Sequence, residues 1–256
     1  MRVDLPSDEW GVGRYEETAA ELQPAAEEAV AALALDPGAS VLDVACGSGN
    51  AAAVATAEGA LVSGIDSSAR LIAVARERIP QGEFVVGDAA RLPYPDGAFD
   101  AAVSVFGVIF ASPAERAAGE LARVVRRGGR LAITTWPSRG PVFEVVSLMR
   151  QALARVRPPE GPPPMDWGDP AVLERLLGRY GRLDVSERTL AYDGSSPEQA
   201  WERRERLHPV WVRARRVLEP AGEWEALRAD SIASMSASAR EGATESPYLL
   251  ATLVRD

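Results

Sequence analysis

The stretch VLDVACGSGN, residues 41–50, decides the fold. Its first five residues, Val41 to Ala45, are apolar except for Asp43 and are typical of a buried strand that runs into a turn. Gly47 and Gly49 let the backbone approach a ligand closely, and a helix expected from Asn50 presents free N–H groups behind them. Ligands of doubly wound sheets bind beyond the carboxyl ends of the strands. The stretch therefore predicts an α/β fold with a ligand site after its first strand.

Apolar runs alternate with helical patterns from Ser40 to Trp136, which is typical of βαβ units in a parallel sheet. We predict a doubly wound, mainly parallel, seven-stranded sheet with helical lid insertions. The predicted strands are 41–45, 61–65, 83–86, 100–105, 130–135, 183–192 and 248–254. The predicted helices are 15–35, 50–58, 68–78, 113–126 (ended by Gly128-Gly129), 142–156 and 171–180, and several over 197–227 with breaks at Pro209 and Pro220.

The whole chain, residues 1–256, reads as one domain with four parts. Residues 1–36 are expected to form N-terminal lid helices, and 37–140 the ligand-binding core. Residues 141–246 are expected to supply helical insertions and a late strand that form an acceptor pocket. The last strand then falls within 247–256.

Three acidic residues, one inside the first predicted strand and two after later strands, bear on two interpretations of the glycine turn, although the ribose acid is common to both. GSGNAA fits a loose dinucleotide-binding pattern. However, Asp43 would face a pyrophosphate unfavourably, whereas it suits a ligand that carries an ammonium or sulfonium group. Asp66 can accept both hydroxyls of a ribose and forbids a 2′-phosphate, and Asp88 can accept a hydrogen bond from an adenine amino group.

These motifs resemble those of the class I S-adenosylmethionine (SAM)-dependent methyltransferases. VLDVACGSGN, GIDSS, GDAARLPYPDGAFD and ELARVVRRGGRLAITTW occur in the family's order and spacing between Tyr15 and Trp136. The resemblance implies SAM as cofactor and S-adenosylhomocysteine as product. It assigns the methionine part to Asp43, Gly47 and Gly49 with Ala45 and Asn50 of the same turn, the ribose to Asp66 and Ser67, the adenine to Asp88 and Ala89, and the methionine side after the fourth strand to Ser104, Val105 and Phe106.

The acceptor pocket is expected to come from aromatic residues of the variable segments, because such a pocket suits a flat, apolar small molecule. His208, the one histidine, is the candidate general base. It stands before Pro209 at a helix end, where a capping role is equally natural. Tyr192 is a weaker candidate. The aromatic candidates, which could also be core or lid packing, are Trp10, Tyr15, Phe106, Phe110, Trp136, Trp167, Trp201 and Trp211.

The composition of the chain argues against several classes of substrate and bound group. The net charge of −9 argues against a nucleic-acid substrate, which normally meets a basic face. A single cysteine, Cys46, excludes an intrachain disulfide, and no His/Cys cluster has metal-ligand spacing. Because neither a signal peptide nor an apolar run long enough for a membrane span is evident, we expect a cytoplasmic protein. The expected partner is a small-molecule acceptor, and monomer and homodimer stay open.

The sequence thus predicts a SAM-dependent methyltransferase acting on a hydroxyl or amine of a small, aromatic or natural-product-like molecule. One alternative is an NAD-dependent oxidoreductase, which Asp43 and Asp88-Ala89 disfavour and for which a Tyr-x-x-x-Lys pair is impossible without lysine. Two others keep SAM. One is a sensing or scaffold protein, and the other is an enzyme of non-methylating chemistry such as cyclisation.

Overall fold

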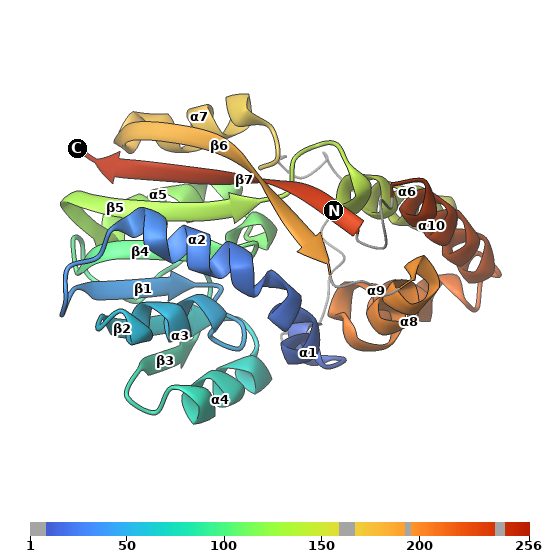
Figure 1. The fold of residues 1–256 in the computed structure, drawn as a ribbon, viewed down its shortest axis with the longest axis horizontal. Coiled ribbons are helices and arrows are strands. Elements are labelled where there is room, and N and C mark those ends of the chain that lie inside the picture. The colour runs from blue at the N-terminus through green and yellow to red at the C-terminus, as the bar shows by residue number, and fades with distance from the viewer. Residues whose placement is uncertain (1–8, 159–166, 193–195, 239–243) are drawn as a thin grey trace.

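The computed structural model describes residues 9–158, 167–192, 196–238 and 244–256 (Figure 1). One seven-stranded sheet runs through it in the order β3-β2-β1-β4-β5-β7-β6. The strand β7 is antiparallel to both its neighbours, and β1 to β5 are parallel. This confirms the predicted fold class. The strands are β1 (Ser40–Val44), β2 (Leu61–Asp66), β3 (Glu83–Val86), β4 (Phe99–Val105), β5 (Val125–Thr135), β6 (Gly181–Tyr192) and β7 (Thr244–Arg255).

Helices cover both faces of the sheet because its central strands are apolar on both sides. In β1, Val41 packs with α2 (Gln23–Leu33), α3 (Asn50–Ala57) and α4 (Ala69–Arg78), whereas its neighbour Leu42 packs with α5 (Ala114–Val124) and α7 (Pro170–Leu177). In Figure 1, α2 lies across the front of the sheet. The loops that follow β1, β2 and β4 are therefore held on two packed layers.

Four further helices form a separate apolar cluster, which we call the helical cluster: α6 (Pro141–Val156), α8 (Pro197–Leu207), α9 (Pro209–Leu218) and α10 (Trp224–Ser238). It lies beyond the carboxyl ends of the parallel strands (Figure 1). A proline occupies the first turn of α6, α8 and α9, where its missing N–H has no helical partner to lose. Within the described ranges, no helix is both long and apolar enough to cross a bilayer.

The N-terminal segment is broken where the sequence predicts one helix. It comprises η1 (Glu9–Gly11), α1 (Tyr15–Ala19) and η2 (Ala20–Leu22) before α2 begins. We call residues 9–22 the strap. It lies between the sheet and the helical cluster (Figure 1). The first eight residues of the predicted lid are outside the described residues.

The junction of α5 and β5 corrects one prediction. The sequence predicts that Gly128-Gly129 ends the helix, but α5 ends at Val124 and both glycines lie inside β5. The pairing of β4 with β5 shifts register here, from Phe99 opposite Val125 to Ala101 opposite Arg130. A side chain on Gly129 would meet the Asp100 carbonyl oxygen at 2.5 Å. The glycine therefore serves close strand approach rather than helix termination.

Candidate functional site

The glycine loop, Ala45 to Asn50, joins the carboxyl end of β1 to α3. Three of its residues are left-handed: Ala45 (φ 54°), Gly47 (φ 53°) and Gly49 (φ 82°). For Ala45 this conformation is strained, and such strain is concentrated at ligand sites. Cys46 is buried and its N–H donates to the Ile65 carbonyl at 3.0 Å, which ties the loop to β2. The loop thus presents backbone rather than side chains at the edge of the sheet.

Asp66 ends β2 and holds the loop from below. Its Oδ2 accepts the Gly47 N–H at 2.9 Å, and its Oδ1 accepts the Ser68 N–H at 2.8 Å. An ionised carboxylate accepts hydrogen bonds and donates none, so Asp66 suits donors such as the hydroxyls of a ribose. Ser67, the neighbour predicted to share the ribose, is exposed, while Ser68 is buried and caps α4. Asp66 therefore fixes the loop and suits a vicinal diol.

Asp43 is buried in β1 directly below the loop. Its Oδ2 accepts the Ala52 N–H at 3.0 Å. Burial raises the pKa of Asp43 from 3.8 to about 7; the Ala52 hydrogen bond opposes this and the nearby Asp66 charge adds to it. A carboxyl group near half-ionisation at neutral pH favours a cationic neighbour. The geometry thus suits an ammonium or sulfonium ligand better than a pyrophosphate.

Asp88 and Ala89 follow β3 at the rim of the same edge. Asp88 is exposed, and its Oδ1 accepts the Ala90 N–H at 2.8 Å. A bridge between Asp88 and Arg91 closes this turn. A carboxylate has about four lone-pair sites, so Asp88 keeps the capacity to accept a second donor, such as the amino group of a base.

The end of β4 gives its three predicted residues different surroundings. Ser104 is buried, donates to the Val44 carbonyl at 2.7 Å and accepts the Val108 N–H at 2.9 Å. Val105 borders the cavity beside the glycine loop. Phe106 is left-handed (φ 54°) and buried, and its ring stacks on Trp136 at 4.0 Å between centroids. Of the three side chains, Val105 is the one that lines this cavity.

Four ring side chains meet above the loop, and we call them the aromatic cluster: Trp10, Tyr15, Phe110 and His208. The Trp10 ring lies 4.8 Å from Phe110 and 5.6 Å from Tyr15, and the Tyr15 ring lies 5.6 Å from His208. Tyr15 also lies over Gly47, since a side chain there would meet its Cε1 at 3.3 Å. Phe110 is 55% exposed. Residues far apart in the chain thus pack into one cluster of rings.

His208 is the N-cap of α9, and its Nδ1 accepts the Val210 N–H at 3.3 Å. Burial, aided by the Arg204 charge, lowers the pKa of His208 to about 4. The ring is therefore neutral at pH 7. With Nδ1 accepting, the single proton of the neutral ring is on Nε2.

The remaining residues predicted to bind the acceptor or to act as a base lie outside the aromatic cluster. Trp201 and Trp211 pack on each other in the helical cluster, 4.9 Å apart, and the Trp201 indole N–H donates to Glu205. Trp167 is buried with the α5 and α7 side of the core. Trp136 lies against Phe106. Of Tyr192, only its place at the end of β6 lies within the described structure.

Sequence reasoning missed the contacts that fix the strap. Asn50 Nδ2 donates to the Ala19 carbonyl at 2.7 Å, and Arg70 on α4 binds both Gly11 and Glu16. These partners are 31, 59 and 54 residues apart. No periodicity or short motif reports such pairs. Over the part of the chain that is described, no three His, Cys, Asp or Glu side chains gather as a metal site.

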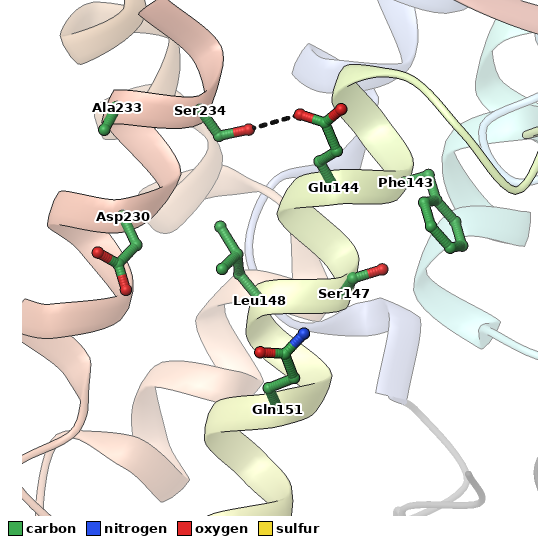
Figure 2. Close-up of a pocket in the computed structure, with 8 residues that line it drawn as sticks. All are labelled: Phe143, Glu144, Ser147, Leu148, Gln151, Asp230, Ala233 and Ser234. Carbon is green, nitrogen blue, oxygen red and sulfur yellow. Dashed lines mark hydrogen bonds between the residues drawn. The ribbon is translucent and has the colours of Figure 1, made fainter. Parts of the chain in front are cut away.

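Two hollows differ in place and size. A cavity of about 30 Å³ lies beside the glycine loop, with Tyr15, Leu22, Asp43 and Val105 among its lining residues. That volume is about the share of one water molecule in the liquid. A groove of about 470 Å³ lies between α6 and α10 (Figure 2).

The groove is not part of the glycine-loop site. Leu148 and Glu144 point across it towards α10, while Phe143 lies on the other side of α6 (Figure 2). Glu144 accepts a hydrogen bond from the Ser234 hydroxyl at 2.9 Å. All residues that line the groove lie on α6 and α10, so no loop at the end of a strand contributes to the groove.

Comparisons with known proteins agree with this architecture. A family model described as a methyltransferase domain matches residues 42–133. The protein Rv1405c of Mycobacterium tuberculosis is 33% identical over 194 residues, which cover 70% of either chain. A demethylmenaquinone methyltransferase of Renibacterium salmoninarum is 32% identical over 167 residues, 60% of this chain and 70% of that one.

A solved structure gives the same fold at lower identity. It is a putative methyltransferase from an antibiotic biosynthesis pathway of Anabaena variabilis, and it aligns with a TM-score of 0.64. The alignment covers 90% of this chain and 96% of that chain at 19% identity. At this identity, the likeness bears on the fold alone.

Proposed function

The chain belongs to the class I SAM-dependent methyltransferase family, and from this membership we propose that it methylates a hydroxyl or amine of a small, flat, apolar molecule. It is a SAM-dependent enzyme, and the acceptor class is the part that we propose. The observation that carries the proposal is the aromatic cluster, which reaches the glycine loop through Tyr15.

The residues around the glycine loop fit SAM in their chemistry. Asp66 lies at the end of β2, where its carboxylate suits the ribose hydroxyls, and the bare Gly47 backbone permits close approach. Asp43 gains from a cation nearby, because a positive charge favours its ionised form. Asp88 would meet the adenine amino group at the rim. When bound, SAM supplies an electrophilic methyl group on a sulfonium centre.

The chain's own contribution to methyl transfer is then to position the acceptor and exclude water. Holding two reactants in line converts a bimolecular step into an effectively unimolecular one. Trp10, Tyr15 and Phe110 provide ring faces and edges for this purpose, and a planar acceptor can stack on them. Such a pocket binds flat apolar molecules in preference to polar ones.

The relatives support a small acceptor. The R. salmoninarum protein is named a demethylmenaquinone methyltransferase. We extend to this chain only the class of acceptor, a small organic molecule, and propose a role in natural-product biosynthesis.

We propose His208 as the side chain that handles the acceptor's proton. Its lowered pKa keeps the ring neutral, as a base must be. Because Nε2 carries the proton, Nδ1 is the nitrogen that can accept another, and doing so requires the ring to release the Val210 N–H. In the resting ring, Nε2–H can instead donate to an acceptor oxygen.

An acceptor panel tests the proposal. Wild-type protein and His208→Ala are incubated with SAM and with 2-naphthol, hydroquinone or phenethylamine, or with the non-aromatic cyclohexanol or glycine, and S-adenosylhomocysteine is measured by mass spectrometry. We expect faster product formation with the aromatic acceptors, and about 100-fold slower turnover of the best one by His208→Ala with unchanged SAM affinity. Equal rates with glycine would reject the acceptor class. Unchanged turnover would remove His208 from the mechanism.

A further inference from the structure

The strap, residues 9–22, occupies the approach to the glycine loop. Tyr15 at the start of α1 places its ring over Gly47 and borders the 30 Å³ cavity. Leu22 and Ala19, also in the strap, border the same cavity. Because the Tyr15 ring lies over Gly47 and the cavity beside it measures about 30 Å³, Tyr15 stands in the way of a nucleoside-sized ligand at the Gly47 backbone.

Two side chains of the core bind the strap: Asn50, which donates to the Ala19 carbonyl, and Arg70, which makes the larger number of contacts. Arg70 on α4 donates from Nε to the Gly11 carbonyl at 2.9 Å. Its two terminal nitrogens bind the two carboxylate oxygens of Glu16 at 3.2 and 2.8 Å. The bond to Arg70 lowers the pKa of Glu16, so the pair is ionised at neutral pH. A bidentate pair of this kind is stronger and more directional than a single contact.

The other side of the strap is fastened to the helical cluster. The Arg14 N–H donates to the Leu207 carbonyl at 2.9 Å, and Glu21 pairs with Arg203 at 2.8 Å. Gly13 lies so close to the Leu207 carbonyl that an added Cβ would come within 2.3 Å of its oxygen. Leu207 directly precedes His208. Displacing the strap therefore breaks contacts next to the aromatic cluster as well.

We propose that the strap is the gate for SAM and that the Arg70–Glu16 pair is its latch. The inference rests on the proposed function, since it assumes that SAM binds at the glycine loop. Entry of SAM requires Tyr15 to leave Gly47, and Tyr15 cannot move far while Glu16, the next residue, is held by Arg70. Weakening the latch therefore raises the population of the open strap and speeds SAM association.

The chain offers a matched control one residue away. Glu17 forms its ion pair with Arg14, which belongs to the strap itself, whereas Glu16 reaches across to α4. Glu16→Gln and Glu17→Gln remove the same charge from the same helix. Only the first of them removes an ion pair between the strap and the core.

The test measures SAM binding rather than turnover. Stopped-flow tryptophan fluorescence gives the association rate of SAM for wild type, Glu16→Gln, Glu17→Gln and Arg70→Lys, and Trp10→Phe identifies the strap's share of the signal. We expect about five- to tenfold faster association for Glu16→Gln and Arg70→Lys, which both lose the bidentate geometry, and a wild-type rate for Glu17→Gln. Circular dichroism confirms that each variant is folded.

The outcomes separate the two proposals. SAM binding at equal rates by all folded variants, or equal acceleration by Glu16→Gln and Glu17→Gln, overturns the latch and leaves the proposed function standing. Failure of every protein, wild type included, to bind SAM overturns the proposed function together with the latch that rests on it.

Discussion

Asp43 is a buried carboxyl group whose ionisation destabilises the fold and serves the ligand. Its pKa is raised to about 7, so the folded protein holds a proton on it that the unfolded chain releases near pH 4. The native state therefore loses stability as the pH rises from about 4 to about 7, and the loss is complete above that range. A bound cation would reverse this, because it favours the carboxylate.

Asp43→Asn should separate the two effects. The amide oxygen can still accept the Ala52 N–H, and the variant cannot ionise. We expect it to exceed wild type in free energy of unfolding by about 1–2 kcal/mol at pH 8, with a smaller difference at pH 5, and to bind SAM at least about tenfold more weakly. Urea unfolding at both pH values and titration calorimetry measure this. Asp88→Asn, at an exposed position, is the control for the stability measurement. A difference that does not change with pH would mean that Asp43 is ionised throughout.

Individual site residues can be predicted where the local backbone requires a particular residue type. Gly47, Gly49 and Asp66 can be identified because a tight turn and a strand end impose their own requirements. The contact between Tyr15 and His208 cannot be predicted, because the sequence around either residue gives no sign of a partner so far away in the chain.

At the element scale, the start of β1 is tied to β4 by a second carboxylate. Asp100 Oδ2 accepts the Ser40 N–H and hydroxyl at 2.8 and 2.7 Å, and its Oδ1 binds Arg126 at 2.6 Å. The bond to Arg126 is the main cause that lowers the pKa of Asp100 to about 2, with the two Ser40 bonds adding to it. The clamp fixes the end of the two strands opposite the ligand site.

Asp100→Asn should weaken this clamp. A lowered carboxyl pKa contributes stability that is complete above about pH 4 and is lost as the pH falls towards 2. Because the side chain is about one-third exposed, we expect a loss of about 1 kcal/mol at pH 7, which shrinks as the pH falls from 4 to 3. Urea unfolding at pH 7, 4 and 3 measures it. Asp96→Asn, whose partner Arg123 keeps Glu120, is the control and should change less. A loss that is constant with pH would mean that the charge of Asp100 is not involved.

Helices and strands can be predicted where their buried faces require a regular pattern of apolar residues. The strands β1 to β4 match their apolar runs closely because the sheet is covered on both faces. The sequence predicts α10 only to Leu227, yet the helix continues to Ser238. The turns after Leu227 are rich in serine and alanine, and their only buried residues are Ser231 and Met235. No apolar stripe therefore marks this part of the helix in the sequence.

In the molecule as a whole, two apolar bodies border the ligand site that we propose. The sheet carries the glycine loop and the helical cluster carries His208, and the strap contacts both. A ligand held between them stabilises the folded state by mass action.

A thermal-shift panel tests this arrangement. SAM or S-adenosylhomocysteine at about 100 times its dissociation constant should raise the melting temperature by about 5–10 °C in a single transition. NAD, which shares the ribose and adenine but has pyrophosphate charges near Asp43, should give no shift. A shift with NAD alone would restore the oxidoreductase alternative. Two transitions would show that the helical cluster unfolds by itself.

The alternation of strands and helices predicts the overall architecture. It does not predict the order in which the last two strands lie in the sheet. β7 lies between β5 and β6 in the sheet although it is made last. Long antiparallel pairing is decided by partners that the local sequence does not specify.

This order has a consequence for synthesis on the ribosome. β6 has its place in the sheet only through β7, yet residues 181–192 are translated more than fifty residues before β7 begins at Thr244. Until then a nascent chain carries two unsatisfied strand edges, on β5 and on β6, which are templates for mispairing with other chains. Emergence of the twelve residues of β7 closes both edges at once, so the sheet is completed only after this strand has been made.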